Sequence, residues 1–213
     1  MRNPRILAEE LEKTPLPPKG AGERFAGYGV LGLPFRSGHI LAFRRMPASS
    51  IGPGYTTLWH RSPTGSWTFF TDADPVLSCP RYFGKGVDKV VVGEIELGWD
   101  GPYDLSLRVP GAGLQWGIRL SSDFRTRALS VFGWLAPRWI WKNRRVLASL
   151  GPLAGRFLNL GRLSLVGSVP NAHTFRAAPR LLWRVEASAA LVAREDLGPI
   201  QAHQEQTKLG DLW

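Results

Sequence analysis

The spacing of hydrophobic and polar positions divides the chain into a short helix, a long series of strands and a helical segment that interrupts them. Residues 4–13 repeat apolar positions at helical intervals, and Asn3 followed by Pro4 supplies an N-cap and a favoured first helical residue. The proline-rich stretch 14–20 ends this helix as a stiff linker. The sequence therefore predicts a short N-terminal helix joined by a linker to the rest of the chain.

After the linker, short runs rich in aromatic and β-branched residues alternate with turns rich in Gly, Pro and Ser. Such strands, with turns at intervals of about ten residues, are typical of sandwiches and closed barrels. The sequence lacks the alternation of strands and helices that is typical of a parallel sheet. We predict a mainly β, antiparallel, barrel-like (calycin-type) sheet. The expected strands cover 27–35, 39–46, 55–61, 67–72, 87–97, 103–109, 114–120, 161–168 and 181–192.

A helical insertion is predicted at about 126–150, because the spacing of apolar residues changes from two to about 3.6 there. Pro137 separates two helices, and Gly151 with Pro152 predicts a stop. We expect residues 1–20 to hold the N-terminal helix and linker and 21–200 to form a single domain. Within it, 126–158 would form a lid or insertion, and a polar tail, 201–213, would follow.

Charge adds a second feature to this insertion. The chain has a formal net charge of +10, and residues 124–185 contain eleven Arg and Lys but no Asp or Glu. Three interpretations of this charge fit. The segment could be a helical lid with its apolar side toward a barrel mouth, it could contact an anionic membrane surface, or it could bind nucleic acid. Nucleic acid is disfavoured because no known binding module is visible and the cations are mixed with Leu, Ile and Val rather than with Gly, Ser and Asn. The residues expected to form the lid or membrane contact are Trp134, Arg138, Trp139, Trp141, Lys142, Arg144 and Arg145.

Several classes of site are not expected. Cys79 is the only cysteine, which excludes an intrachain disulfide and fits a reducing cytoplasm. The four histidines lack the spacing of metal ligands, and no Walker or dinucleotide motif lies between a strand and a helix, so neither a metal nor a cofactor is predicted. No signal peptide or spanning helix is expected either. We predict a cytoplasmic protein, with a peripheral place at the membrane if the basic segment binds lipid.

The densest group of chemically active residues lies in 55–83. Strand parity predicts that Trp59 shares a face with Phe70 and Asp72, while His60 shares the other with Trp67. A carboxyl group against aromatic walls can act as a general acid, although Asp72 could also organise the turn before Pro75.

Two further segments offer polar groups. Cys79 is expected to be a buried, inert thiol, whereas Arg81 is a candidate clamp for an anion, or else a surface salt bridge. The loop 170–176 carries an amide, an imidazole and a guanidinium between two strands, and His173 is the preferred acid-base residue there. The candidate catalytic residues are His60, Asp72 and His173. The candidate ligand-binding residues are Trp59, Trp67, Phe70, Arg81, Tyr82 and Asn171.

The aromatic hairpin 58–67 with Asp72, and the loop 170–175 followed by 182–185, resemble bacterial lipocalin-like (calycin) hydratases and cyclases that act on isoprenoid or polyketide substrates. The resemblance implies a barrel in which His60, Asp72, Tyr82 or His173 protonates or positions an apolar ligand. We therefore expect a protein that binds a hydrophobic small molecule, with cofactor-free cyclisation, isomerisation or hydration if it is an enzyme. The alternatives are a peripheral membrane protein without catalysis and a nucleic-acid-binding protein.

Overall fold

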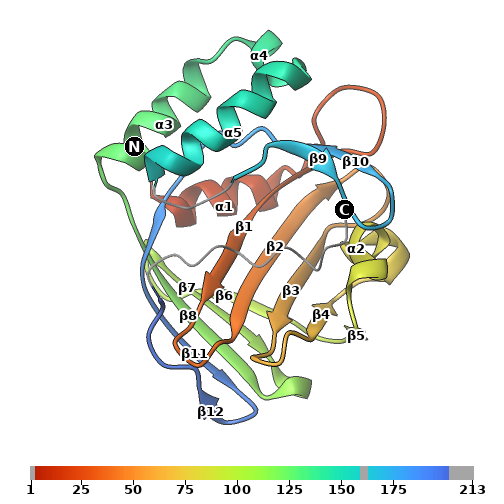
Figure 1. Ribbon diagram of the computed structural model, residues 1–213, viewed down its shortest axis with the longest axis vertical. Helices are drawn as coiled ribbons and strands as arrows, with labels where there is room; N and C mark the ends of the chain where they lie inside the picture. The colour runs from red at the N-terminus through yellow and green to blue at the C-terminus, as the bar shows by residue number, and fades with distance from the viewer. Residues whose placement is uncertain (1–2, 159–162, 202–213) are drawn as a thin grey trace.

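The predicted strands pair into two five-stranded sheets in the computed structural model, which describes residues 3–158 and 163–201 (Figure 1). The first sheet is ordered β1 (Phe25–Pro34), β2 (Ile40–Ser49), β3 (Tyr55–Arg61), β4 (Trp67–Thr71) and β5 (Lys89–Val92). The second is ordered β12 (Glu195–Asp196), β11 (Arg184–Val192), β8 (Leu114–Ser121), β7 (Asp104–Val109) and β6 (Glu96–Trp99). Apart from β4 and β5, which are parallel, neighbouring strands are antiparallel. A mainly β, antiparallel protein is therefore confirmed.

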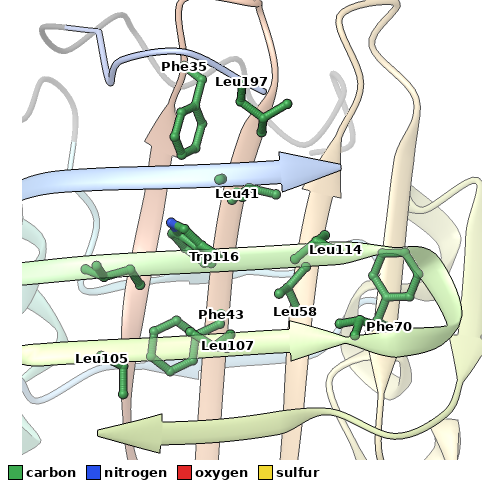
Figure 2. Close-up of a cluster of buried hydrophobic side chains, with 13 residues drawn as sticks. Phe35, Leu41, Phe43, Leu58, Phe70, Leu105, Leu107, Leu114, Trp116 and Leu197 are labelled. Carbon is green, nitrogen blue, oxygen red and sulfur yellow. The ribbon is translucent and has the colours of Figure 1, made fainter. Parts of the chain in front are cut away.

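The core lies between the two sheets, whose strands run across one another (Figure 2). Leu41, Phe43 and Leu58 project from the first sheet, and Leu107 and Trp116 meet them from the second, each at most 1% exposed. Such burial removes most of the apolar surface of these strands from water and is the main stabilising contribution to the fold. Among the described strands, neither sheet closes on itself.

The expected strand 87–97 is two strands, one in each sheet. β5 ends after Val92, where Gly93 N–H donates the last ladder hydrogen bond to Thr71 O, and β6 begins at Glu96. The three intervening residues carry the chain from the first sheet to the second. The sequence could not show this, because the apolar residues of both strands pack against the same core.

Glycines in β1 let this strand curve against β2. A Cβ at Gly27 would lie 2.1 Å from Arg45 O, and one at Gly29 would lie 2.2 Å from Phe43 O. The pairing of β1 with β2 shifts register near both positions. Bulges of this kind bend a strand and increase its twist.

The predicted N-terminal helix is confirmed as α1 (Pro4–Lys13), with Asn3 Oδ1 accepting a hydrogen bond from Ile6 N–H. Short helical turns cover the outer face of the first sheet: η1 (Pro75–Leu77), α2 (Pro80–Phe83) and η2 (Gly84–Gly86). A further turn, η3 (Pro110–Ala112), joins β7 to β8.

The helical insertion contains α3 (Phe124–Leu135), α4 (Arg138–Lys142) and α5 (Arg144–Leu158), which we call the helical unit. It gathers at the top of Figure 1, beyond the end of the sandwich. The second predicted helix is divided because Asn143 Oδ1 accepts from the N–H groups of Arg145 and Val146 and so starts α5. Among the described residues, no helix combines the length and the apolar composition that a membrane crossing requires.

The stop predicted at Gly151 and Pro152 is wrong, since α5 continues to Leu158. A proline inside a helix removes one backbone hydrogen bond, and packing can offset that loss. Gly151 allows the close packing here, because a Cβ at this position would lie 2.7 Å from Leu163 O. The close packing of α5 at Gly151 therefore outweighs the tendency of Gly and Pro to end a helix.

After α5 the chain forms the hairpin β9 (Val166–Ser168) and β10 (Thr174–Arg176), which carries the predicted 170–176 loop. The beginning of the expected strand 161–168 falls partly outside the described residues, and so does the predicted tail beyond residue 201.

Candidate functional site

The three candidate catalytic residues lie in three separate places. His60 and Asp72 share a face of the first sheet but lie at opposite ends of it, because His60 is paired with Thr68, four residues before Asp72. Four residues of strand span about 13 Å. His173 lies in the β9–β10 hairpin, against Tyr82 of α2. These positions do not form one acid-base site.

The predicted faces of the β3–β4 hairpin are wrong by one residue. Trp59 pairs with Phe69, and Leu58 pairs with Phe70, so Trp59 and Trp67 share the outer face while Phe70 and Asp72 share the inner face with His60. The reason is the turn: Ser62 N–H donates to Ser66 O, Gly65 N–H donates to Ser62 O, and Gly65 has a φ of +96°. This five-residue connection sets the register.

His60 forms a pair with His39, a residue that the sequence did not single out. His39 Nδ1 lies 2.7 Å from His60 Nε2, and the two rings are nearly parallel. Burial and the neighbouring His39 lower the pKa of His60 to about 4, and burial lowers the pKa of His39. The pair is therefore neutral near pH 7, and one imidazole donates to the other.

This pair predicts a loss of stability in acid. Both histidines bind protons more readily in the unfolded chain, where the pKa of a histidine side chain is near 6.5. The free energy of unfolding should therefore fall as the pH decreases from about 6.5 toward 4. His60→Gln should reduce this fall by about 1 kcal/mol, less than the full shift implies because water screens the half-buried ring, as measured by urea unfolding at several pH values. His173→Gln, at an exposed position, is the matched control and should leave the fall unchanged. Equal pH profiles for wild type and His60→Gln would contradict the assignment.

Asp72 lies at the other end of the inner face, beside a cavity. Its Oδ1 accepts from Thr56 N–H at 2.6 Å, and its own N–H donates to Thr56 O. The cavity has a volume of about 390 Å³ and lies between α1 and the ends of both sheets. Glu12, Tyr28, Arg45 and Trp99 also line it. Asp72 is thus next to charged and aromatic groups, but not next to the Trp59 wall predicted for it.

The outer face of the first sheet is an aromatic layer beneath α2. Trp59 stacks on Phe69 with ring centroids 4.5 Å apart, and Phe83 of α2 lies 4.8 Å from Trp59. Cys79 is buried in this layer and its Sγ donates to Tyr55 Oη at 3.7 Å. Burial raises the pKa of the Cys79 thiol. A thiol in this state is a poor nucleophile, as expected for an inert cysteine.

The remaining predicted binding residues come together in one surface cluster, organised by a residue that the sequence did not indicate. Glu23 accepts from Arg81 Nη2 at 2.6 Å and from Tyr82 Oη, and these hydrogen bonds lower the pKa of Glu23. Asn171 Nδ2 donates to Arg81 O, and its Oδ1 accepts from Lys85 N–H. Tyr82 and His173 have ring centroids 5.1 Å apart. Arg81 thus forms a surface ion pair, and Asn171 holds the backbone of α2 and η2.

The helical unit packs with small residues toward the protein. On α3 the buried residues are Thr126, Ser130 and Gly133. Ser130 Oγ accepts from Leu182 N–H, and a Cβ at Gly133 would lie 2.8 Å from Arg180 O. On α5 the buried residues are Leu147 and two glycines. Since the small side of α3 is the inner side, the apolar-side-down arrangement expected of a lid is wrong for this helix.

Many of the large apolar side chains of the helical unit, including most of those on α3, face outward instead. Phe124 is 81% exposed and Trp134 is 75% exposed. Trp141 differs from the prediction, because it is buried against Phe132 and beneath the guanidinium of Arg180. Of the fifteen large hydrophobic side chains exposed among the described residues, eight belong to the helical unit: Phe124, Val131, Phe132, Trp134, Leu135, Trp139, Leu153 and Phe157.

The helical unit also carries many exposed cations. The seven Arg and Lys of the helical unit are exposed, and the unit contains no Asp or Glu. None of the ion pairs among the described residues involves the unit. It therefore carries an uncompensated positive charge beside exposed aromatic rings.

Comparison of the chain with models of known protein families, with curated proteins and with solved structures finds no match. The resemblance to lipocalin-like hydratases and cyclases stays a prediction.

Proposed function

We propose that the protein binds an anionic membrane surface through the helical unit. The observation that carries this proposal is the orientation of α3, which turns Thr126, Ser130 and Gly133 inward and its largest apolar side chains outward. An exposed patch of this kind on a folded protein marks an interaction surface.

The pattern along α3 supports an interface parallel to the helix. Phe124, Val131 and Leu135 recur at intervals of seven and four residues, which places them on one stripe. Thr126 and Ser130 lie on the opposite stripe. A helix with one apolar stripe outside and a packed stripe inside can lie in the plane of a membrane interface.

Charge favours lipid over a protein groove as the partner. Arg138, Lys142, Arg144 and Arg145 belong to the same helical unit as the exposed rings of Trp134 and Trp139 and follow Trp134 within eleven residues of the sequence. Indole rings partition to the headgroup level of a bilayer, and each cation near an anionic leaflet contributes about 1 kcal/mol. A segment with exposed tryptophans and cations without ion pairs therefore gains from both the partitioning of indole and the attraction to anionic lipid.

Binding of a hydrophobic molecule inside the β domain has less support. In the described part of the chain, side chains from both sheets fill the space between them, and the 390 Å³ cavity at the end of the sandwich is lined by charged residues. The three candidate acid-base residues are also separated, which gives catalysis no common site.

Vesicle co-sedimentation tests the membrane proposal. The protein should sediment with vesicles that contain phosphatidylglycerol and much less with vesicles of phosphatidylcholine alone. Raising the salt from about 0.1 M to 1 M should weaken binding, because the Debye length falls from about 10 Å to 3 Å. The apolar contribution should leave a residual bound fraction at high salt.

A failure to bind anionic vesicles at low salt would refute the proposal. A mobility-shift assay with duplex DNA runs in parallel, and salt-sensitive DNA binding without vesicle binding would assign the positive charge to nucleic acid instead.

A further inference from the structure

We propose that the cavity between α1 and the sandwich binds a small organic cation, with Asp72 as counter-ion and the rings of Trp99 and Tyr28 as an aromatic wall. The site shares no residue with the helical unit and does not depend on membrane binding. Its volume of about 390 Å³ is in the range of pockets for small molecules.

The polar side chains that line the cavity near Asp72 are hydrogen-bonded to one another. Arg45 Nε and Nη2 donate to the two oxygens of Glu12 at 2.8 and 2.7 Å, and Tyr28 Oη donates to Glu12 at 3.0 Å. Burial and the charge of Glu12 raise the pKa of Tyr28, so its hydroxyl remains a neutral donor. Arg45 is therefore bound to Glu12, and the two carboxylates of Glu12 and Asp72 share this one cation.

In the part of the chain that the structure describes, Asp72 has no ion-pair partner of its own, and Arg45, whose charge it also attracts, is already hydrogen-bonded to Glu12. Glu9, which also lines the cavity, is paired with Arg5 at 2.7 Å. Asp72 accepts a hydrogen bond from Thr56 N–H, and among the described residues it has no ion pair within 4.0 Å. In a chain of net charge +10, the cavity therefore holds one net negative charge that attracts a cation.

The surroundings of this charge favour an organic ammonium over a metal ion. Calcium and magnesium need several oxygen ligands, and the described residues contain no group of three His, Cys, Asp or Glu that could hold a metal. The ring centroids of Tyr28 and Trp99 lie 6.5 Å apart, and Ile95 and Leu97 add apolar surface. Aromatic rings attract ammonium groups through cation–π interactions, and the carboxylate fixes the charged end.

Isothermal titration calorimetry with choline tests the proposal, with 3,3-dimethylbutan-1-ol as a neutral probe of the same shape. Choline should bind and the neutral alcohol should bind at least about tenfold more weakly. Asp72→Asn keeps an acceptor for Thr56 N–H but removes the charge, and should weaken choline binding by about tenfold or more. Asp74→Asn is the matched control, because Asp74 caps η1 two residues away and should bind as wild type does.

Absence of choline binding to the folded wild-type protein, or equal affinity in Asp72→Asn, would overturn the proposal. Thermal unfolding of each variant verifies that the fold is kept. A free metabolite and a lipid headgroup carry the same ammonium, so the titration is repeated with vesicles of phosphatidylcholine alone. Choline binding that these vesicles do not displace supports a free metabolite, and displacement supports a headgroup.

Discussion

Replacing Arg138, Lys142, Arg144 and Arg145 together by glutamate is expected to release the protein from anionic vesicles. All four side chains are exposed, and no acidic residue lies between positions 124 and 185 to offset them. At about 1 kcal/mol for each cation near an anionic leaflet, loss of four weakens binding by about a thousandfold, and the new negative charges add repulsion. Co-sedimentation with phosphatidylglycerol vesicles at low salt measures the loss.

The matched control reverses four cations outside the helical unit: Lys19, Lys85, Lys89 and Arg108. These four side chains are also exposed. Because four cations become glutamate in each variant, the two variants have the same net charge. It should retain most of the binding, because screening limits the effect of charges more than about 10 Å from the membrane. Equal losses in the two variants would mean that net charge, and not the helical unit, governs binding.

Trp116→Ala is expected to destabilise the protein by about 3–5 kcal/mol, the usual cost of removing a buried aromatic ring. Trp116 is 1% exposed and lies in the core between the sheets, where its ring meets Phe43 edge-on at 5.9 Å (Figure 2). Its Nε1–H donates to Ser188 Oγ at 2.8 Å, which joins β8 to β11. The substitution therefore creates a cavity and removes a cross-strand hydrogen bond together.

Urea unfolding measures this loss, and Trp134→Ala provides the control. Trp134 is 75% exposed, so its removal should change the free energy of unfolding by no more than about 0.5 kcal/mol. If Trp134→Ala were as destabilising as Trp116→Ala, the helical unit could not present this ring to solvent, and the membrane proposal would lose its main support.

Local signals predicted most elements, because they act within a few residues. Asn3 caps α1, and the turn residues separate most of the strands where expected. The faces of β3 and β4 were wrong because a difference of one residue in the length of the turn moves every side chain to the other side of the sheet.

Contacts between distant segments could not be read from the sequence. The inward side of α3 depends on Ser130 and Gly133 meeting residues about fifty positions later, so the pattern of apolar residues suggested the opposite orientation. Asp72 was singled out for its chemistry, but its cavity also needs Glu12, Arg45 and Trp99, which come from α1, β2 and β6. Glu12 and Arg45 are 33 positions apart, so no local sequence pattern could predict their ion pair.

The concentration of positive charge in one part of the chain makes the protein an electric dipole. Residues 124–185 hold eleven cations of a chain whose net charge is +10, so the remainder is close to neutral. A field from an anionic surface acts on such a molecule before contact and turns its positive end forward. The helical unit would then arrive first, and the opposite end of the sandwich, where β12 lies in Figure 1, would point toward the aqueous phase.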